Sequence, residues 1–181
     1  MTKDAGQAVQ AMLEQASEQL KAGSFETAIE AFSACLLVSP QESAAFRGRA
    51  TARFQLKDWK HAAADFKCAY ELDPSEPESG LGLGLTLAMQ NEVYPAIAVY
   101  ETLLQKHPNY VRAYIQLGVL HFKLAAIAKG RDYLQEALKH HPTLEERRYI
   151  EAALINQDKL DRNRYYRPDF EALRKRKSED A

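Results

Sequence analysis

The sequence predicts an all-α protein built as a solenoid of repeated helix–turn–helix units. Pro40, Pro74, Pro108 and Pro142 lie thirty-four residues apart. Before each proline, apolar residues recur at steps of four and then three, which places them on one face of a helix. Runs that alternate like a β-strand are almost missing from the 181 residues. A fixed period of this length, with helical patterning inside it, indicates stacked two-helix units.

Each unit is predicted to hold a leading helix, a turn and a second helix that ends at its proline, because proline cannot continue a helix. In the second unit, Ala62, Phe66 and Ala69 form the apolar face of the second helix. A short lead-in, residues 1–8, comes first. The units cover residues 9–142 and have the approximate bounds 9–42, 43–76, 77–110 and 111–144.

The turn between the two helices of a unit is occupied by Gly23, Lys57, Asn91 and Ala125 in the four units. Glycine adopts the left-handed backbone conformation of such turns at low cost, whereas alanine does not. We therefore expect the turn of the fourth unit to be the least regular.

The leading helix of the third unit contains Gly80, Gly82 and Gly84, a run that invites comparison with phosphate-binding loops. Their spacing matches neither nucleotide-binding fingerprint, and no strand or Lys-Ser/Thr pair accompanies them. We interpret the glycines as small residues that allow close packing of helices. The segment Ser75–Glu78 is interpreted as a capping box at the start of this helix.

A second capping box at Thr143–Glu146 predicts a further helix at residues 143–158. A stacked solenoid needs such a cap, because its last unit would otherwise expose an apolar face. Residues 159–181 then form a basic, aromatic tail with eight Lys/Arg and five Asp/Glu, a net charge of +3. The rest of the chain has sixteen against twenty, a net charge of −4.

Composition and motifs argue against several classes of protein. No apolar run approaches the length of a membrane span, and the first residues lack the apolar stretch of a secretory signal. We expect a cytoplasmic protein in which Cys35 and Cys68 are free thiols. The five histidines form no metal-ligand pattern with cysteines or carboxylates, and no serine-elbow motif occurs. The sequence thus predicts neither an enzyme nor a metal or cofactor site.

The four units resemble tetratricopeptide repeats over residues 9–142. The family pattern has a bulky fourth residue, a small eighth residue, and an alanine, an aromatic residue and a proline further on. The fourth residues here are Met12, Phe46, Gly80 and Tyr114, and the eighth are Ala16, Ala50, Gly84 and Gly118. The resemblance implies a right-handed superhelix that serves as a non-catalytic scaffold for protein–protein interaction, as in adaptors and chaperone-like assembly factors.

One subclass of the family clamps the terminal carboxylate of a peptide with lysine, asparagine and arginine at fixed positions of its concave groove. These positions hold Leu13, Ser17, Gly48, Glu78 and Gly82 in the first three units, or Arg47, Thr51, Gly82, Arg112 and Gln116 in the last three. The first set lacks the cations and the second lacks the asparagines. A carboxylate clamp is therefore not expected.

The resemblance also implies that the leading helices line a groove for an extended or helical segment of a partner protein. The residues expected to face it are Leu13, Ser17, Arg47, Thr51, Phe54, Leu81, Leu85, Ala88, Arg112, Ile115, Gln116, Val119 and Phe122. The apolar residues between Leu81 and Phe122 are interpreted as a docking strip, since contiguous exposed apolar area marks binding sites. Burial of part of this strip between helices is the alternative.

The tail residues Tyr165, Tyr166 and Phe170 are interpreted as a second contact, made with the same chain, with a neighbouring copy or with the partner. A solvated basic tail without such contacts is the alternative, and self-association through groove or tail remains open. The alternative function is binding of nucleic acid or another anionic surface through this tail. The acidic body of the chain argues against that function.

Overall fold

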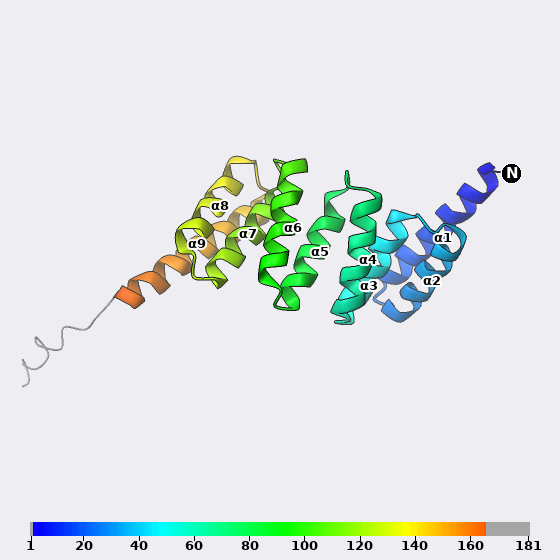
Figure 1. Cartoon of the computed structure of the whole chain (residues 1–181), viewed down its shortest axis with the longest axis horizontal. Coiled ribbons are helices and arrows are strands. Elements are labelled where there is room, and N and C mark those ends of the chain that lie inside the picture. The colour runs from blue at the N-terminus through cyan, green and yellow to red at the C-terminus, as the bar shows by residue number, and fades with distance from the viewer. Residues whose placement is uncertain (1, 166–181) are drawn as a thin grey trace, which may run out of the picture.

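The computed structural model describes residues 2–165, which are helical apart from the turns between helices (Figure 1). The helices are α1 (Thr2–Lys21), α2 (Phe25–Val38), α3 (Ser43–Gln55), α4 (Trp59–Leu72), α5 (Pro77–Met89), α6 (Val93–Lys106), α7 (Val111–Lys123), α8 (Ile127–Lys139) and α9 (Leu144–Tyr165). Each helix packs on the next, so that four helix pairs stack in chain order and α9 closes the stack. The predicted all-α solenoid is confirmed.

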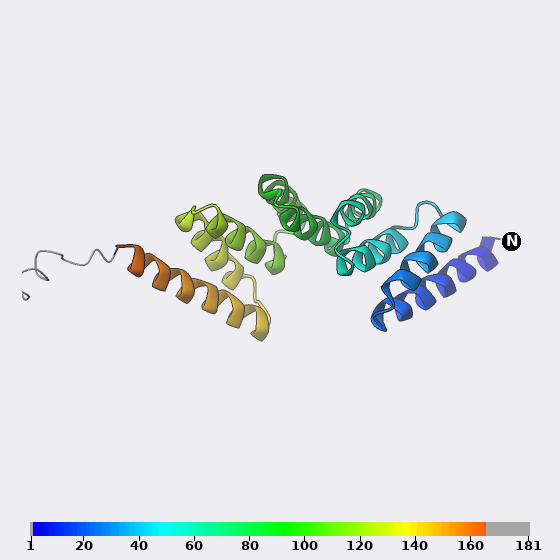
Figure 2. The same cartoon turned by 90° about the horizontal axis from the view of Figure 1, so that it is seen from below.

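The helices α1, α3, α5 and α7 are the leading helices of the four units. Leading helices of neighbouring units contact each other, and α7 also contacts α9. Within residues 2–165, no two second helices are in comparable contact. The leading helices therefore lie together on one side of the stack, and for the first three units Figure 2 shows this side as the inner side of an arch. Side chains of the leading helices form the concave surface.

The first and last helices are longer than the sequence predicted. Helix α1 begins at Thr2, so the described part of the expected lead-in is helical. Helix α9 continues past residue 158 to Tyr165, so the first part of the segment assigned to the tail extends the capping helix. No proline or glycine occurs between residues 143 and 165, so nothing local ends the helix at residue 158.

All four turns within the units place one residue in the left-handed conformation, and φ is 77°, 62°, 64° and 58° for Gly23, Lys57, Asn91 and Ala125. The fourth turn is closed by the Ala126 amide, which donates to the His121 carbonyl at 2.9 Å. The equivalent bond of the first turn, from Ser24 to Gln19, is 3.0 Å long. The expected irregularity is thus not visible in the geometry. Ala125 adopts the left-handed conformation at a cost of about 1–2 kcal/mol.

One of the two predicted capping boxes is confirmed. The Glu146 amide donates to the Thr143 hydroxyl at 3.2 Å, and the Thr143 amide donates to the Glu146 carboxylate at 2.8 Å. The prediction for α5 is wrong, because the Ser75 hydroxyl instead donates to Asp73 at 2.6 Å. Helix α5 begins at Pro77 without a side-chain cap. Proline suits this place because its missing N–H would have no partner in the first turn.

The glycines of α5 allow close helix packing, as interpreted, and do not form a loop. A Cβ atom at Gly82 would overlap the ring of Phe66, and one at Gly84 would overlap the ring of Tyr100. The ring of Phe32 lies over Gly48 in the same way as Phe66 lies over Gly82. Second helices therefore approach leading helices so closely that no side chain fits between them.

A buried ion cluster joins the first two units. Asp65 on α4 is 4% exposed and accepts two bonds of 2.8 Å from Arg49 and one of 2.6 Å from Arg53. Arg49 also donates to the Ser33 hydroxyl on α2 at 3.1 Å. A buried carboxylate is stable in a protein only when it is paired in this way. The cluster fixes α2, α3 and α4 relative to one another.

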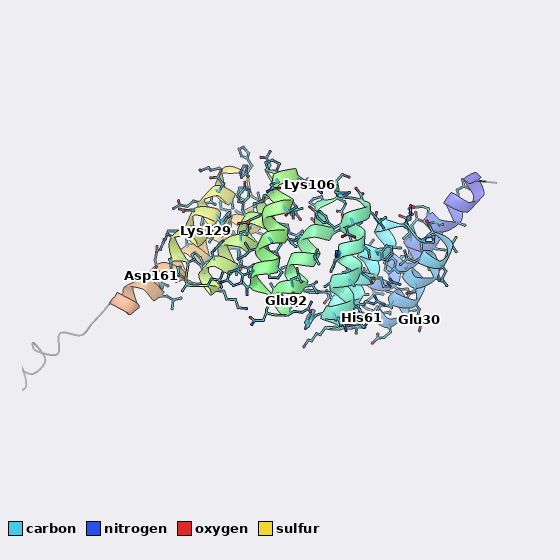
Figure 3. All side chains as sticks on the ribbon, viewed as in Figure 1. Glu30, His61, Glu92, Lys106, Lys129 and Asp161 are labelled. Carbon is cyan, nitrogen blue, oxygen red and sulfur yellow. The ribbon has the colours of Figure 1, made fainter. Side chains whose placement is uncertain are left out.

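Helix α9 is held on the end of the stack by apolar and ionic contacts. Ile150 is fully buried, in a cluster with Leu134 on α8. Arg131 on α8 pairs with both Asp158 and Asp161 of α9, and Figure 3 shows Asp161 beside the last units. The helix thus caps the apolar end of the solenoid, as predicted.

Candidate binding groove

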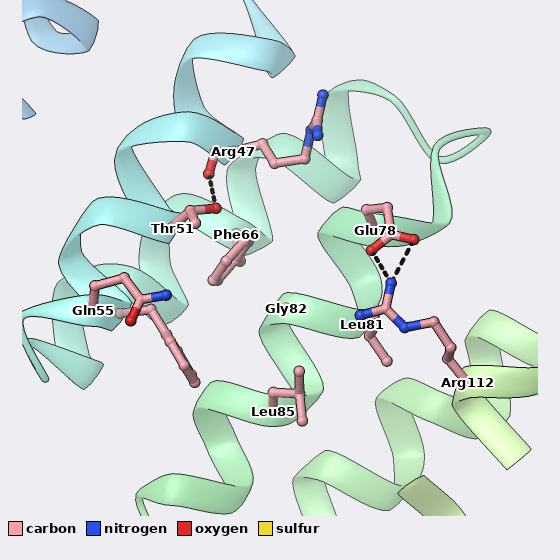
Figure 4. A pocket seen from close by; sticks show the side chains of 10 residues that line it. Arg47, Thr51, Gln55, Phe66, Glu78, Leu81, Gly82, Leu85 and Arg112 are labelled. Carbon is pink, nitrogen blue, oxygen red and sulfur yellow. Dashed lines mark hydrogen bonds and ion pairs between the residues drawn. The ribbon is translucent and has the colours of Figure 1, made fainter. Parts of the chain in front are cut away.

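A pocket of about 320 Å³ opens on the concave side between α3 and α5 (Figure 4). It is lined by Arg47, Thr51, Phe54, Gln55, Phe66, Glu78, Leu81, Gly82, Leu85 and Arg112. The apolar lining residues include the almost fully buried Leu81 and the half-buried Phe54 and Leu85. A concave site with apolar walls and a few polar groups is the usual form of a ligand pocket.

Two aromatic rings give the pocket its shape. Phe66 belongs to the outer helix α4, yet its ring reaches the concave side because Gly82 has no side chain in its way. Phe54 packs edge-on against Trp59, with 4.9 Å between the ring centroids. Both rings are held by packing, so the pocket is formed before any ligand arrives.

The charged residues at the rim are paired with one another. Arg47 Nε lies 3.2 Å from the Glu76 carboxylate. Arg112 Nη1 donates to the two oxygens of Glu78 at 2.9 and 2.7 Å (Figure 4), and the Tyr110 hydroxyl donates to the same carboxylate at 2.7 Å. Burial and this bond raise the pKa of the Tyr110 phenol. The rim therefore carries polar groups that can form hydrogen bonds, while each of the two arginines is neutralised by a glutamate.

A smaller pocket of about 140 Å³ continues the concavity towards α1. It is lined by Leu13, Ser17, Leu20, Phe32, Ala44, Arg47, Gly48 and Thr51. Arg47 and Thr51 line both pockets, so the two are neighbours on one continuous surface. We call this surface, made of the residues of the two pockets, the groove.

Eight of the thirteen predicted groove residues line it. They are Leu13, Ser17, Arg47, Thr51, Phe54, Leu81, Leu85 and Arg112. The other five, which line neither pocket, are Ala88, Ile115, Gln116, Val119 and Phe122. Ala88 packs against the core formed by α5, α6 and α7, and Gln116 and Val119 are half-buried on α7.

The apolar strip predicted on the fourth unit belongs largely to the core. Ile115 is 5% exposed and shares a cluster with Leu134 and with Ile150 of α9. Phe122 points to α8, where its ring lies over Gly130. The cap covers part of α7, and a side chain that faces a cap has the same sequence spacing as one that faces a ligand. This is why the pattern could not separate the two.

Several lining residues were not predicted. They are Gln55, Phe66, Glu78 and Gly82 in the larger pocket, and Leu20, Phe32, Ala44 and Gly48 in the smaller one. A signal for four of them was present in the sequence. Phe32 precedes Gly48, and Phe66 precedes Gly82, by the same sixteen residues at the same place in successive units.

The predicted tail contacts lie at or beyond the end of the described residues. Tyr165 is the last residue of α9, and Tyr166 and Phe170 lie outside the described residues.

Both cysteines are free, and burial raises the pKa of the Cys35 thiol. In the described part of the chain, no three His, Cys, Asp or Glu side chains are grouped to hold a metal ion. None of the helices described there is long and apolar enough to span a lipid bilayer.

The groove, the helix pairs and the capping helix define a helical-repeat protein. The model of the tetratricopeptide repeat family matches residues 13–77 and 81–145. The chain therefore belongs to the tetratricopeptide repeat family, whose members are generally scaffolds for protein–protein interaction.

Proteins of similar sequence or structure are consistent with this family assignment. The chain is 26% identical over 127 residues to the Protein CTR9 homolog of Arabidopsis thaliana, which covers 68% of this chain but only 12% of that protein. PilF of Pseudomonas aeruginosa is similar in structure, with a TM-score of 0.75, 18% identity and coverage of 86% of this chain and 71% of that one. The first tetratricopeptide domain of Spaghetti (RPAP3), solved with a bound HSP90 peptide, has a TM-score of 0.62, 24% identity and coverage of 66% and 94%. At these identities the two structures show the fold alone.

Proposed function

We propose that the protein is a non-catalytic adaptor or assembly factor that holds an extended segment of a partner protein in the groove. The single observation that carries this proposal is the apolar pocket of about 320 Å³ in the middle of the concave side. A large apolar side chain of the partner enters this pocket, between Phe54, Phe66 and Leu85. The polar rim then bonds the partner's main chain.

The two pockets suggest the spacing of the ligand's anchors. Packed helices lie about 8–10 Å apart, so pockets on successive leading helices are separated by roughly this distance. An extended chain in the polyproline II conformation advances about 3.1 Å per residue and brings every third side chain to the same face. The proposed ligand therefore carries two apolar side chains about three residues apart. The larger one occupies the pocket of about 320 Å³ and the smaller one the pocket of about 140 Å³.

A terminal carboxylate is not part of the proposed recognition. The RPAP3 structure holds an HSP90 peptide, but the two arginines of this groove are already occupied. Arg47 pairs with Glu76, and Arg112 pairs with Glu78. A ligand carboxylate could pair with one of these arginines only by displacing its glutamate. Amidation of the C-terminal carboxylate of a bound peptide should therefore change the affinity little.

The expected affinity is modest. Burying one large apolar side chain stabilises a complex by ~1.5–3 kcal/mol. Ordering an extended peptide and losing its free motion offset part of the gain from both anchors and from the main-chain bonds. We therefore expect dissociation constants in the micromolar range, which suits reversible assembly.

The test begins with peptides selected from a random display library on the wild-type protein, whose affinities are then measured by calorimetry. Leu85→Glu places a carboxylate in the apolar pocket and should weaken binding at least about tenfold, since an unpaired charge is costly to bury. Leu37→Glu is the matched control, because Leu37 on the outer helix α2 is 86% exposed. Circular dichroism should show both variants folded. If Leu85→Glu binds like the wild type, the groove is not the site.

A further inference from the structure

The outward face of α9 carries apolar side chains that are exposed at the end of the solenoid. Tyr149, Ile155 and Leu160 are 51%, 53% and 63% exposed. Ile150, on the opposite side of the helix, is fully buried against the last unit. Figure 2 shows α9 at one end of the arch, beyond the last helix pair. The terminal unit of a repeat solenoid normally has a polar outer face. The exposure of these three apolar side chains therefore indicates that another molecule covers them.

The exposed residues form two neighbouring rows along the helix. The first row is Tyr149, Ala152, Asn156 and Leu160, and the second row is Arg148, Glu151, Ile155 and Lys159. Each row has steps of three, four and four, the spacing of one helix face. All eight residues are exposed. The small Ala152 and Asn156 in the middle of the first row allow another helix to approach closely.

We propose that a second copy of this chain covers the outward face of α9, with the two α9 helices antiparallel and related by a two-fold axis at Ile155. The charges of Glu151 and Lys159 are self-complementary about this residue. Glu151 lies four residues before Ile155 and Lys159 lies four residues after it. In the antiparallel pair, Glu151 of each copy therefore faces Lys159 of the other, and the contact occurs twice.

The apolar residues fit the same axis. Ile155 meets its own counterpart, and Tyr149 of one copy meets Leu160 of the other, because they lie six residues before and five residues after the axis. A parallel pair would instead bring Glu151 against Glu151 and Lys159 against Lys159. The charges thus favour the antiparallel arrangement.

The size of the surface sets the strength of the contact. A face one helix wide buries less than the ~800 Å² per partner of a standard stable complex. We therefore infer a reversible dimer that forms with rising concentration. The groove lies between α1, α3 and α5, so dimerisation leaves it free and joins two grooves in one particle. Two linked sites bind a partner with two matching segments more tightly than one site does.

The first test is sedimentation velocity of the full chain between about 1 and about 200 µM, a range that spans weak association. The wild type should shift from monomer to dimer, and Ile155→Arg should remain monomeric. Leu37→Arg is the control, because it changes an even more exposed apolar residue on α2 and should dimerise normally. A wild type that stays monomeric, or an Ile155→Arg variant that dimerises as the wild type does, overturns the proposal.

The second test exchanges the charges. Glu151→Lys and Lys159→Glu, each alone, replace two attractive pairs by two repulsive ones and should weaken the dimer by about tenfold. An equimolar mixture of the two variants should regain wild-type association, because every residue 151 then faces an opposite charge at residue 159. If the mixture associates no better than either variant alone, the antiparallel pairing is wrong.

Discussion

The first two junctions between units differ from the third. At each of the first two, an aromatic ring of the second helix lies over a glycine of the following leading helix: Phe32 over Gly48 and Phe66 over Gly82. Both rings end in a pocket of the groove. The glycines therefore do two things at once, since they bring the units close together and leave the concave surface hollow.

At the third junction, Gln116 stands where the second and third units have glycine. The ring of Tyr100 lies over Gly84 of its own unit. The contact between α6 and α7 at this junction is less extensive than the contact between α2 and α3 or between α4 and α5 at the first two junctions. The residue at this position of the repeat thus determines whether the aromatic ring of the preceding second helix can pass to the concave side. Ligand binding, by this account, belongs mainly to the first three units, with Arg112 of α7 at the edge of the groove, and the rest of the fourth unit with α9 forms the closed end.

The largest effect is expected at the ion cluster of the first junction. Asp65→Ala leaves Arg49 and Arg53 without their buried partner and should cost about 3–5 kcal/mol in the free energy of unfolding. Urea denaturation followed by circular dichroism measures this loss. Asp132→Ala on the exposed side of α8 is the control and should change stability by less than ~0.5 kcal/mol. A loss below about 1 kcal/mol for Asp65→Ala would show that the cluster does not hold the junction.

The second effect compares equivalent positions at two junctions. Gly48→Ala forces a methyl group into the ring of Phe32 and should destabilise the protein by about 1–3 kcal/mol. Gln116→Ala, at the same place in the fourth unit, removes only a half-buried polar side chain and should cost less than ~0.5 kcal/mol. Urea titrations of both variants measure the difference. Equal losses at the two positions would mean that the junctions are not distinct.

The third effect concerns the pH dependence of the closed end. His121 is 6% exposed and stacks on Tyr133, and neither ring nitrogen has a hydrogen-bond partner within the described residues. Burial, with Lys129 nearby, lowers the pKa of His121 below 6.5, while Glu101 acts in the opposite direction. The unfolded chain therefore takes up the proton first. The stability contributed by the neutral ring is complete above pH 6.5 and is lost as the pH falls below it.

This loss can be measured by urea denaturation between pH 7.5 and pH 5. The wild type should lose up to ~1.4 kcal/mol per pH unit more than His121→Phe, which keeps a ring but cannot titrate. Identical slopes for the two proteins would show that His121 is already protonated, or already solvated, in the folded state.

The smallest effect compares the turns of the first and fourth units. Ala125→Gly relieves an alanine in the left-handed conformation and should raise the free energy of unfolding by about 1 kcal/mol. Gly23→Ala should lower it by a similar amount through backbone strain alone, because a Cβ atom there would meet nothing within 4 Å. Thermal melts of the two variants should shift in opposite directions. Shifts of the same sign would contradict the shared turn geometry.

The fold was predictable because its signals are local and repeated. The prolines end the second helices, and the residues equivalent to Gly23 close the turns. The groove was only half predictable, because it depends on what covers each face. Ile115 has the spacing of a groove residue, yet α9 covers it. The Asp65 cluster was not predictable, since the pairing of Asp65 with Arg49 exists only after α3 and α4 have packed.

The most direct test of the account is to map where a ligand binds. A peptide selected on the wild type is titrated into the ¹⁵N-labelled full chain, and changes in the amide resonances are followed by NMR. We predict the largest changes in α1, α3 and α5, above all at Thr51, Gly82 and Leu85, with α8 almost unchanged. Largest changes on α7, α9 or the outer helices would contradict the claim that binding belongs to the first three units.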